Sequence, residues 1–264
     1  MGTARSVLLL WILQTVRFGI GQRFQQHEVS HTALIGWTQP SGEIKFDCAG
    51  SYLGKNVIMT GARCLERDGA FTDVVRLGTA MGAPKDFHVH NMSIHYRYQA
   101  EYYYHNMAIL FLTEDPNQVD KHFKPACIYS RPPPIREGKV HLIGRDAGGT
   151  YHRTELDLVD SRKCHEFYNP TRKLKYGALL VCCMCARNPS VNKCASELGS
   201  QMQIVLEKNG KKVPFLVGQK TINRSCGSMI PGIYTRLSSD GHLPWISTIA
   251  RLDFHDHDAC IKKY

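Results

Sequence analysis

The stretch Cys48-Ala-Gly-Ser-Tyr-Leu53, followed by Val57-Ile-Met-Thr-Gly-Ala-Arg-Cys64, holds a short β-branched run between two cysteines. Similar runs, rich in β-branched and aromatic residues and separated by Gly, Pro, Asn and Asp, recur at Thr32–Trp37, Val57–Thr60, Val74–Leu77, Ile109–Leu112, Val140–Ile143, Gln203–Leu206 and Phe215–Val217. Regularly spaced short strands with turn signals between them predict an antiparallel sandwich or barrel. The pattern therefore predicts an all-β protein.

Only the C-terminal end has a helical periodicity. Within Leu243–Leu252, Pro244 suits a first helical turn, and one face carries Trp245, Ile246, Ile249 and Leu252. We expect a helix there. Pro132-Pro133-Pro134 falls between two strand-rich halves and is the best candidate for an internal linker.

The N-terminus has the layout of a secretory signal. A basic start, Met1–Arg5, precedes the apolar run Val7–Leu13, and the small residues Gly19 and Gly21 follow. We expect residues 1–21 to be a signal peptide and residues 22–264 to be the mature domain. The apolar run is too short for a membrane span, which needs about 18–25 apolar residues. Secretion would allow the ten cysteines to form disulfides.

The composition describes a folded and basic chain. Its 264 residues include 43% hydrophobic and 21% charged residues, which argues against disordered and low-complexity classes. This length fits one large β-type domain or two average ones. The net charge of +10 suggests an acidic partner, and charge alone does not distinguish anionic glycans, lipid surfaces and nucleic acid.

Three separated segments resemble one family, the trypsin-like serine proteases. Cys48–Cys64 is similar to the family motif CGGSL…VLTAAHC. His105–Leu110, followed by Pro125–Cys127, is similar to HDIALL…PAC. Cys194–Met202, followed by Leu216–Gly218 and Pro231–Arg236, is similar to CxGDSGGPL…LVG…PGVYTR. Order and spacing hold from Thr32 to Leu252, and Ala33–Trp37 is most similar to arthropod members. The resemblance implies two antiparallel six-stranded β-barrels with a C-terminal helix.

The catalytic positions of that family are altered. Arg63 stands where the family has its histidine base, Asn106 replaces the aspartate, and Leu198 replaces the serine. A guanidinium stays protonated and has no free lone pair, and an isobutyl group has no nucleophilic atom. Loss of the serine or histidine alone costs on the order of 10⁶ in kcat in subtilisin. We therefore expect no triad proteolysis, and no rescue from Ser196 or Ser200, which lie two residues from Leu198.

The resemblance also places the substrate-binding positions. Asn192 falls at the floor of the specificity pocket, where trypsin-like members carry Asp, and the remaining pocket positions are Thr221, Ile222, Asn223 and Gly232. Asn223 replaces a glycine and would narrow the pocket entrance. Asn91 and Asn223 each begin an N-x-S glycosylation acceptor, and a glycan on Asn223 would cover the former cleft.

The resemblance implies three disulfides, Cys48–Cys64, Cys164–Cys185 and Cys194–Cys226. A fourth family pair would fall near Val140 and Ile204, where both cysteines are replaced by apolar residues. We expect Cys127 to pair with Cys260, and the pairing of Cys182 and Cys183 stays open. Secretion favours disulfides over a zinc site in Cys182-Cys183-x-Cys185.

Other candidate sites are minor. His88 and His90 would share a strand face, and His255–Asp258 would lie in a tail. We treat these histidines as surface or packing residues, and we expect neither a metal nor a cofactor. The basic clusters Arg172–Lys175 and Lys208–Lys212 would lie in loops or hairpins, either solvated or binding an anionic surface.

The sequence is thus interpreted as a secreted, non-catalytic serine protease homologue. The resemblance implies a cofactor, decoy or scaffold in an extracellular protease cascade or in innate immunity, with proteases, inhibitors or anionic microbial surfaces as partners and no nucleic acid. Two alternatives remain: an active serine endopeptidase, and a cationic protein that binds anionic or microbial surfaces.

Overall fold

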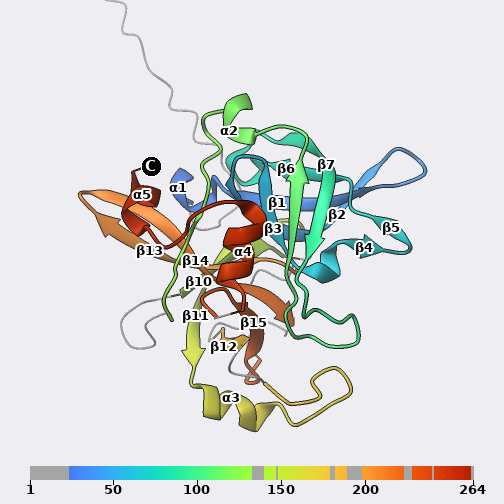
Figure 1. Cartoon of the computed structure of the whole chain (residues 1–264), viewed down its shortest axis with the longest axis vertical. Helices are drawn as coiled ribbons and strands as arrows, with labels where there is room; N and C mark the ends of the chain where they lie inside the picture. Colours follow the sequence, from blue (N-terminus) through green and yellow to red (C-terminus); the bar gives the residue numbers. More distant parts are fainter. Residues whose placement is uncertain are drawn as a thin grey trace, which may run out of the picture.

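The computed structural model describes residues 24–132, 140–146, 148–178, 182–188, 198–222, 228–239 and 241–262. Figure 1 shows two groups of strands side by side, with the C-terminal helix α4 in front of their junction. Several sequence predictions concern residues outside the described ranges, namely the leader 1–21, Pro133, Pro134, Asn192, Cys194, Ser196, Asn223 and Cys226.

Six antiparallel strands close the first barrel in the order β1-β2-β3-β8-β7-β6. They are β1 (Thr32–Thr38), β2 (Ile44–Gly54), β3 (Val57–Thr60), β6 (Val74–Leu77), β7 (Lys85–Ile94) and β8 (Ala108–Leu112). Strands β1, β3 and β8 are buried along almost their whole length, so their sequences are nearly continuous apolar runs. Ile35, Ile58 and Leu110 fill the interior and are completely buried.

Six further strands form the second barrel, because β13 pairs with both β10 and β14. They are β10 (Val140–Arg145), β11 (Tyr151–Val159), β12 (Cys183–Arg187), β13 (Gln201–Lys208), β14 (Lys211–Ile222) and β15 (Gly232–Arg236). The short strand β9 (Cys127–Ile128) adds to β14 in parallel. Val140 and Ile204, which are predicted to replace the two cysteines of a family disulfide, both pack in this barrel's core.

The C-terminal helix α4 (Leu243–Ala250) packs between the barrels. Ile246 is buried, and Trp245, Ile249 and Leu252 pack against the same cluster, as the helical periodicity predicts. Pro244 lies in its first turn. The remaining short elements are α1 (Gln26–Val29), η1 (Ala62–Cys64), β4 (Glu66–Arg67), β5 (Ala70–Phe71), η2 (Thr79–Met81), α2 (Pro116–Val119), α3 (Ser161–Phe167) and α5 (His257–Ile261).

The prediction of two six-stranded barrels with a C-terminal helix is confirmed, and each predicted strand run lies within an observed strand. The prediction that only the C-terminal end is helical is wrong. Helix α3 forms because the Asp160 side chain caps it by accepting the Arg162 N–H. The expected tail at His255–Asp258 leads into α5, which begins at His257, and Asp256 caps this helix by accepting the Ala259 N–H.

Candidate functional site

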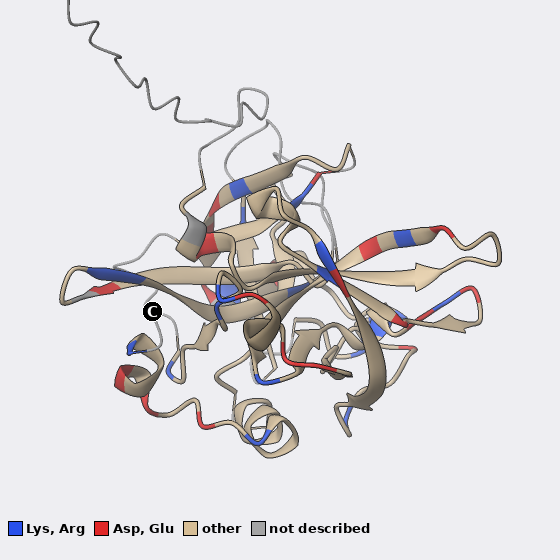
Figure 2. Ribbon diagram, turned by 90° about the horizontal axis from the view of Figure 1, so that it is seen from above, with Lys and Arg blue, Asp and Glu red and all other residues tan. Residues whose placement is uncertain are grey.

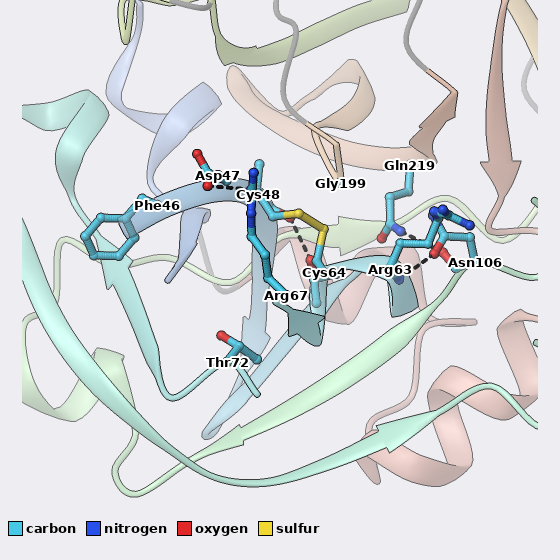
Figure 3. Close-up of a disulfide and its surroundings, with 12 residues drawn as sticks. Phe46, Asp47, Cys48, Arg63, Cys64, Arg67, Thr72, Asn106, Gly199 and Gln219 are labelled. Carbon is cyan, nitrogen blue, oxygen red and sulfur yellow. Dashed lines mark hydrogen bonds and ion pairs between the residues drawn. A yellow bond between two sulfur atoms is a disulfide. The ribbon is translucent and has the colours of Figure 1, made fainter. Parts of the chain in front are cut away.

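Arg63 lies in η1, at the edge of the first barrel. Its backbone N–H donates to Asn106 Oδ1 at 2.9 Å. Its guanidinium points elsewhere: Nη1 donates to the Ala100 carbonyl oxygen at 3.1 Å, and Cζ lies 5.0 Å from the centre of the Tyr103 ring. Figure 3 shows the two residues adjacent to each other, beside the Cys48–Cys64 disulfide. The Arg63 side chain is therefore held on the loop that precedes β8.

Asn106 is 1% exposed and joins the two barrels. Its side-chain oxygen accepts the Arg63 N–H, and its main-chain oxygen accepts a hydrogen bond from Gln219 Nε2 at 2.9 Å. Gln219 belongs to β14 of the second barrel, and Figure 3 shows it above Asn106. The preceding residue, His105, has a φ of 51°, in the left-handed region. Sequence reasoning missed Gln219, because no local pattern distinguishes it from other strand residues.

Leu198 sits on a tight turn against β2. Its carbonyl accepts the Ala49 N–H at 2.8 Å, and its side chain packs on the core of the first barrel. The next residue, Gly199, has a φ of 78°, and an added Cβ would lie 2.1 Å from the Ala49 carbonyl oxygen. Only glycine fits there without displacing the backbone. The turn is therefore fixed in place by its glycine, while the residue it presents is apolar.

The described residues among those predicted to line a specificity pocket lie on two neighbouring strands. Thr221 and Ile222 end β14, and Gly232 begins β15. Thr221 is buried and its hydroxyl lies 2.7 Å from the Thr235 hydroxyl. Asn192 and Asn223 lie outside the described residues. The structure thus brings three of the five positions to one end of the second barrel.

Three disulfides are present among the described cysteines. They join Cys48 to Cys64, Cys127 to Cys260 and Cys164 to Cys185. Cys182 and Cys183 are buried, with their sulfur atoms 3.0 Å apart. The Cys182 thiol and burial raise the pKa of Cys183 well above its usual value. The expected Cys194–Cys226 pair falls outside the described ranges.

Three histidines meet beside Asn106, although they are far apart in the sequence. His95 follows β7, His105 precedes β8, and His242 precedes α4. Their ring centres are 5.1–5.2 Å apart in all three pairs. Burial lowers the pKa of His105 to about 4 and that of His242 to about 3, and it also lowers the pKa of His95. Sequence reasoning missed this cluster, because neither their spacing nor a motif links the three residues.

The remaining sequence candidates are peripheral. Asn91, His88 and His90 are exposed on β7. His257 stacks on the Tyr129 ring and lies 3.0 Å from the Ser130 hydroxyl, so it has a packing role in the structure.

The model of the Trypsin family matches residues 19–246. The chain belongs to the trypsin family. Among curated proteins, it is 28% identical to Serine protease snk of Drosophila melanogaster over 238 residues, which cover 83% of this chain and 54% of that protein. It is 25% identical to the Clotting factor G beta subunit of Tachypleus tridentatus over 272 residues, covering 90% and 86%. The chain therefore spans about half of the Drosophila relative.

Solved structures show the same fold. The mouse brain serine protease neuropsin superimposes with a TM-score of 0.64 at 19% identity, covering 88% of this chain and 99% of that one. This trypsin-family chain thus has the double-barrel architecture of a solved protease. Among its described helices, none is both long and apolar enough to cross a membrane.

Proposed function

We propose that this trypsin-family chain is a secreted protein without protease activity that acts by binding another component of an extracellular protease cascade. The observation that carries the proposal is the set of residues at the triad positions, Arg63, Asn106 and Leu198. The proposed mature domain comprises residues 22–264, after a signal peptide of residues 1–21. The three disulfides of the described chain fit an oxidising compartment.

The chemistry of these three side chains supports the loss of proteolysis. A general base must accept a proton near neutral pH, whereas the Arg63 guanidinium donates its hydrogens to Ala100 and faces Tyr103. Asn106 has its amide oxygen occupied by a backbone N–H. Leu198 has only carbon atoms in its side chain, so it cannot form an acyl intermediate.

The side chains near Leu198 and Asn106 are also poorly placed to act as a substitute nucleophile or base. Ser200 lies two residues after Leu198, and it is 0% exposed. A buried hydroxyl cannot attack a peptide bound at the surface. His105 contacts His242 rather than a serine, with 2.9 Å between Nδ1 and Nε2. Neither residue therefore forms the nucleophile–base pair that hydrolysis needs.

The arthropod relatives support a role in a cascade. One is named a serine protease and another a clotting factor subunit. This chain has the double-barrel fold of these proteases, with a turn fixed by Gly199. We infer that the chain binds a protease or a protease inhibitor as a cofactor, decoy or scaffold.

The net charge of +10 supports a second candidate function, the binding of an anionic surface. Basic residues lie at the β13–β14 hairpin, where Lys211 and Lys212 are exposed, and at the exposed Arg172 and Lys173. Figure 2 shows Lys and Arg interspersed with Asp and Glu over the ribbon rather than gathered in one region. Mixed charge favours the protein-binding proposal over a dedicated anion-binding face.

A fluorophosphonate probe tests the proposal, because it labels only an activated serine. We expect no covalent adduct on the purified chain, while an active trypsin in the same tube is labelled. An adduct on any serine of this chain would show that it is an active endopeptidase. Affinity purification from extracellular fluid should then recover a protease or an inhibitor. Salt-sensitive retention on heparin without a protein partner would instead favour the cationic alternative.

Glycans are proposed at Asn91 and Asn223. Asn91 is exposed on β7, where an oligosaccharide has room. Mass spectrometry of glycopeptides from the secreted protein should find both sites occupied. A bare Asn223 would remove the proposal that a glycan covers the former cleft.

A further inference from the structure

Three imidazoles converge from three separate elements at the junction of the barrels. His95 and His242 are buried, and His105 is partly exposed. One potential ligand atom from each lies within 4.8 Å of those of the other two. Among the described residues this is the one group of three or more metal-ligating side chains so arranged.

The spacing of the rings matches that of a three-histidine metal site. A Zn–N distance of about 2.0–2.1 Å puts each ring centre about 3.2 Å from the metal, and tetrahedral angles then separate ring centres by about 5.2 Å. The observed separations are 5.2 Å for His95–His105, 5.1 Å for His95–His242 and 5.1 Å for His105–His242. The separations of the ring centres therefore fit a tetrahedral ion. The planes of the His95 and His105 rings lie 11° apart, so the rings would also turn to direct their nitrogens at one ion.

The facing nitrogens of His105 and His242 would have to separate and turn toward a shared ion. His105 Nδ1 and His242 Nε2 are 2.9 Å apart, joined by a hydrogen bond. Two ligand nitrogens on a tetrahedral zinc ion are about 3.3 Å apart. An ion would therefore replace this hydrogen bond after the two rings separate by about half an ångström. His105 would move its ring proton from Nδ1 to Nε2, so no net proton is gained or lost by that residue.

Backbone carbonyls orient two of the rings. His242 Nδ1 donates to the Arg236 carbonyl oxygen, which leaves the Nε2 lone pair directed at His105. His95 Nε2 donates to the Gly241 carbonyl oxygen at 3.0 Å, and its Nδ1 accepts the Arg97 N–H at 3.3 Å. An ion bound at His95 Nδ1 would replace that second hydrogen bond. A carbonyl that holds the second ring N–H is the usual outer contact of a metal-bound histidine, because it fixes the tautomer and the ring orientation.

The residues around the three histidines affect how tightly the cluster would bind a cation. The Trp245 ring packs edge-on against His95, and the Tyr96 ring stacks on it. Arg97 is the cation that acts on all three imidazoles. Its positive charge opposes a bound cation and makes the site weaker than one with a carboxylate ligand.

We propose that His95, His105 and His242 bind one divalent transition-metal ion, with Zn²⁺ as the best fit and a fourth position left for water or an outside ligand. Imidazole nitrogens suit zinc, copper and nickel rather than magnesium or calcium. The ion would join the ends of β7, β8 and α4, next to Asn106. This proposal goes beyond the binding function above and does not depend on it.

Titration of the metal-free full chain with Co²⁺ and Zn²⁺ tests the site. We expect visible absorption bands of tetrahedral Co²⁺ that saturate at one ion per chain and are displaced by Zn²⁺. His105→Gln should weaken binding by at least about 100-fold, since a direct ligand matters no less than an outer contact. Because His105 is partly exposed, this variant is expected to fold, and circular dichroism checks that it does.

Two further variants make the test specific. The double variant His88→Gln, His90→Gln removes exposed histidines of β7 and should bind Co²⁺ like the parent chain. Arg97→Gln should tighten binding by about threefold or more, because it removes the opposing charge. The proposal is overturned if the parent chain shows no saturable band, if His105→Gln binds as well as the parent, or if the β7 double variant abolishes binding.

Discussion

The turn that presents Leu198 makes a sharp prediction for Gly199→Ala. Alanine in the left-handed region costs about 1 kcal/mol. In addition, the new Cβ would lie 2.1 Å from the Ala49 carbonyl oxygen, so the turn must move away from β2. That movement breaks the hydrogen bond from the Ala49 N–H to the Leu198 carbonyl, at a cost of about 1 kcal/mol or more. We expect a total loss of at least about 2 kcal/mol.

Gly42→Ala is the matched control. Gly42 has a φ of 85°, and its added Cβ meets nothing within 4 Å. This variant therefore isolates the backbone term, about 1 kcal/mol. Urea denaturation of both variants, followed by fluorescence, measures the difference. If Gly199→Ala is no less stable than Gly42→Ala, the close approach of the turn to β2 is refuted.

Three further predictions concern stability. Burial lowers the pKa of His31 to about 4, so this side chain stays neutral in the fold while the unfolded chain takes up a proton near pH 6.5. The contribution of neutral His31 to the unfolding free energy is complete above pH 6.5 and falls by about 3 kcal/mol by pH 4. His31→Gln should remove that part of the pH dependence of the unfolding free energy, and an unchanged slope would contradict the prediction. Replacing Cys127 and Cys260 by serine removes a disulfide between residues 133 apart and should lower the unfolding free energy by about 2–5 kcal/mol. An unchanged midpoint of urea denaturation would argue against this disulfide. Asn106→Ala leaves the Arg63 N–H without its acceptor and should lower the unfolding free energy by about 1–3 kcal/mol, whereas a neutral effect would show that this contact is dispensable.

The sequence was most informative where local pattern and fold agree. Strands such as β3, rich in β-branched residues, were predictable because their apolar runs are buried on both faces. By contrast β12, Cys183–Arg187, has two cysteines and no β-branched residue, and its extended shape comes from pairing with β11 and β15. The pairing partners supply what the local propensity lacks.

The residues of the candidate site were likewise predictable only where a local sequence motif marks them. Arg63, Asn106 and Leu198 were found because they interrupt motifs at fixed spacing. The contact of Gln219 with Asn106, and the meeting of His95 with His242, depend on how two barrels pack. Packing between distant segments leaves no spacing signal in one sequence, so such contacts required the structure.

Hydrolysis of peptide amides by the purified full-length chain tests the central claim most directly. The assay is run before and after treatment with an activating protease, which is then inhibited and removed. With Arg63, Asn106 and Leu198 at the proposed triad positions, we predict no turnover above buffer, since loss of the serine or the histidine alone costs on the order of 10⁶ in kcat. Turnover that disappears on a single substitution in this chain, such as Ser200→Ala or His105→Gln, would contradict the account.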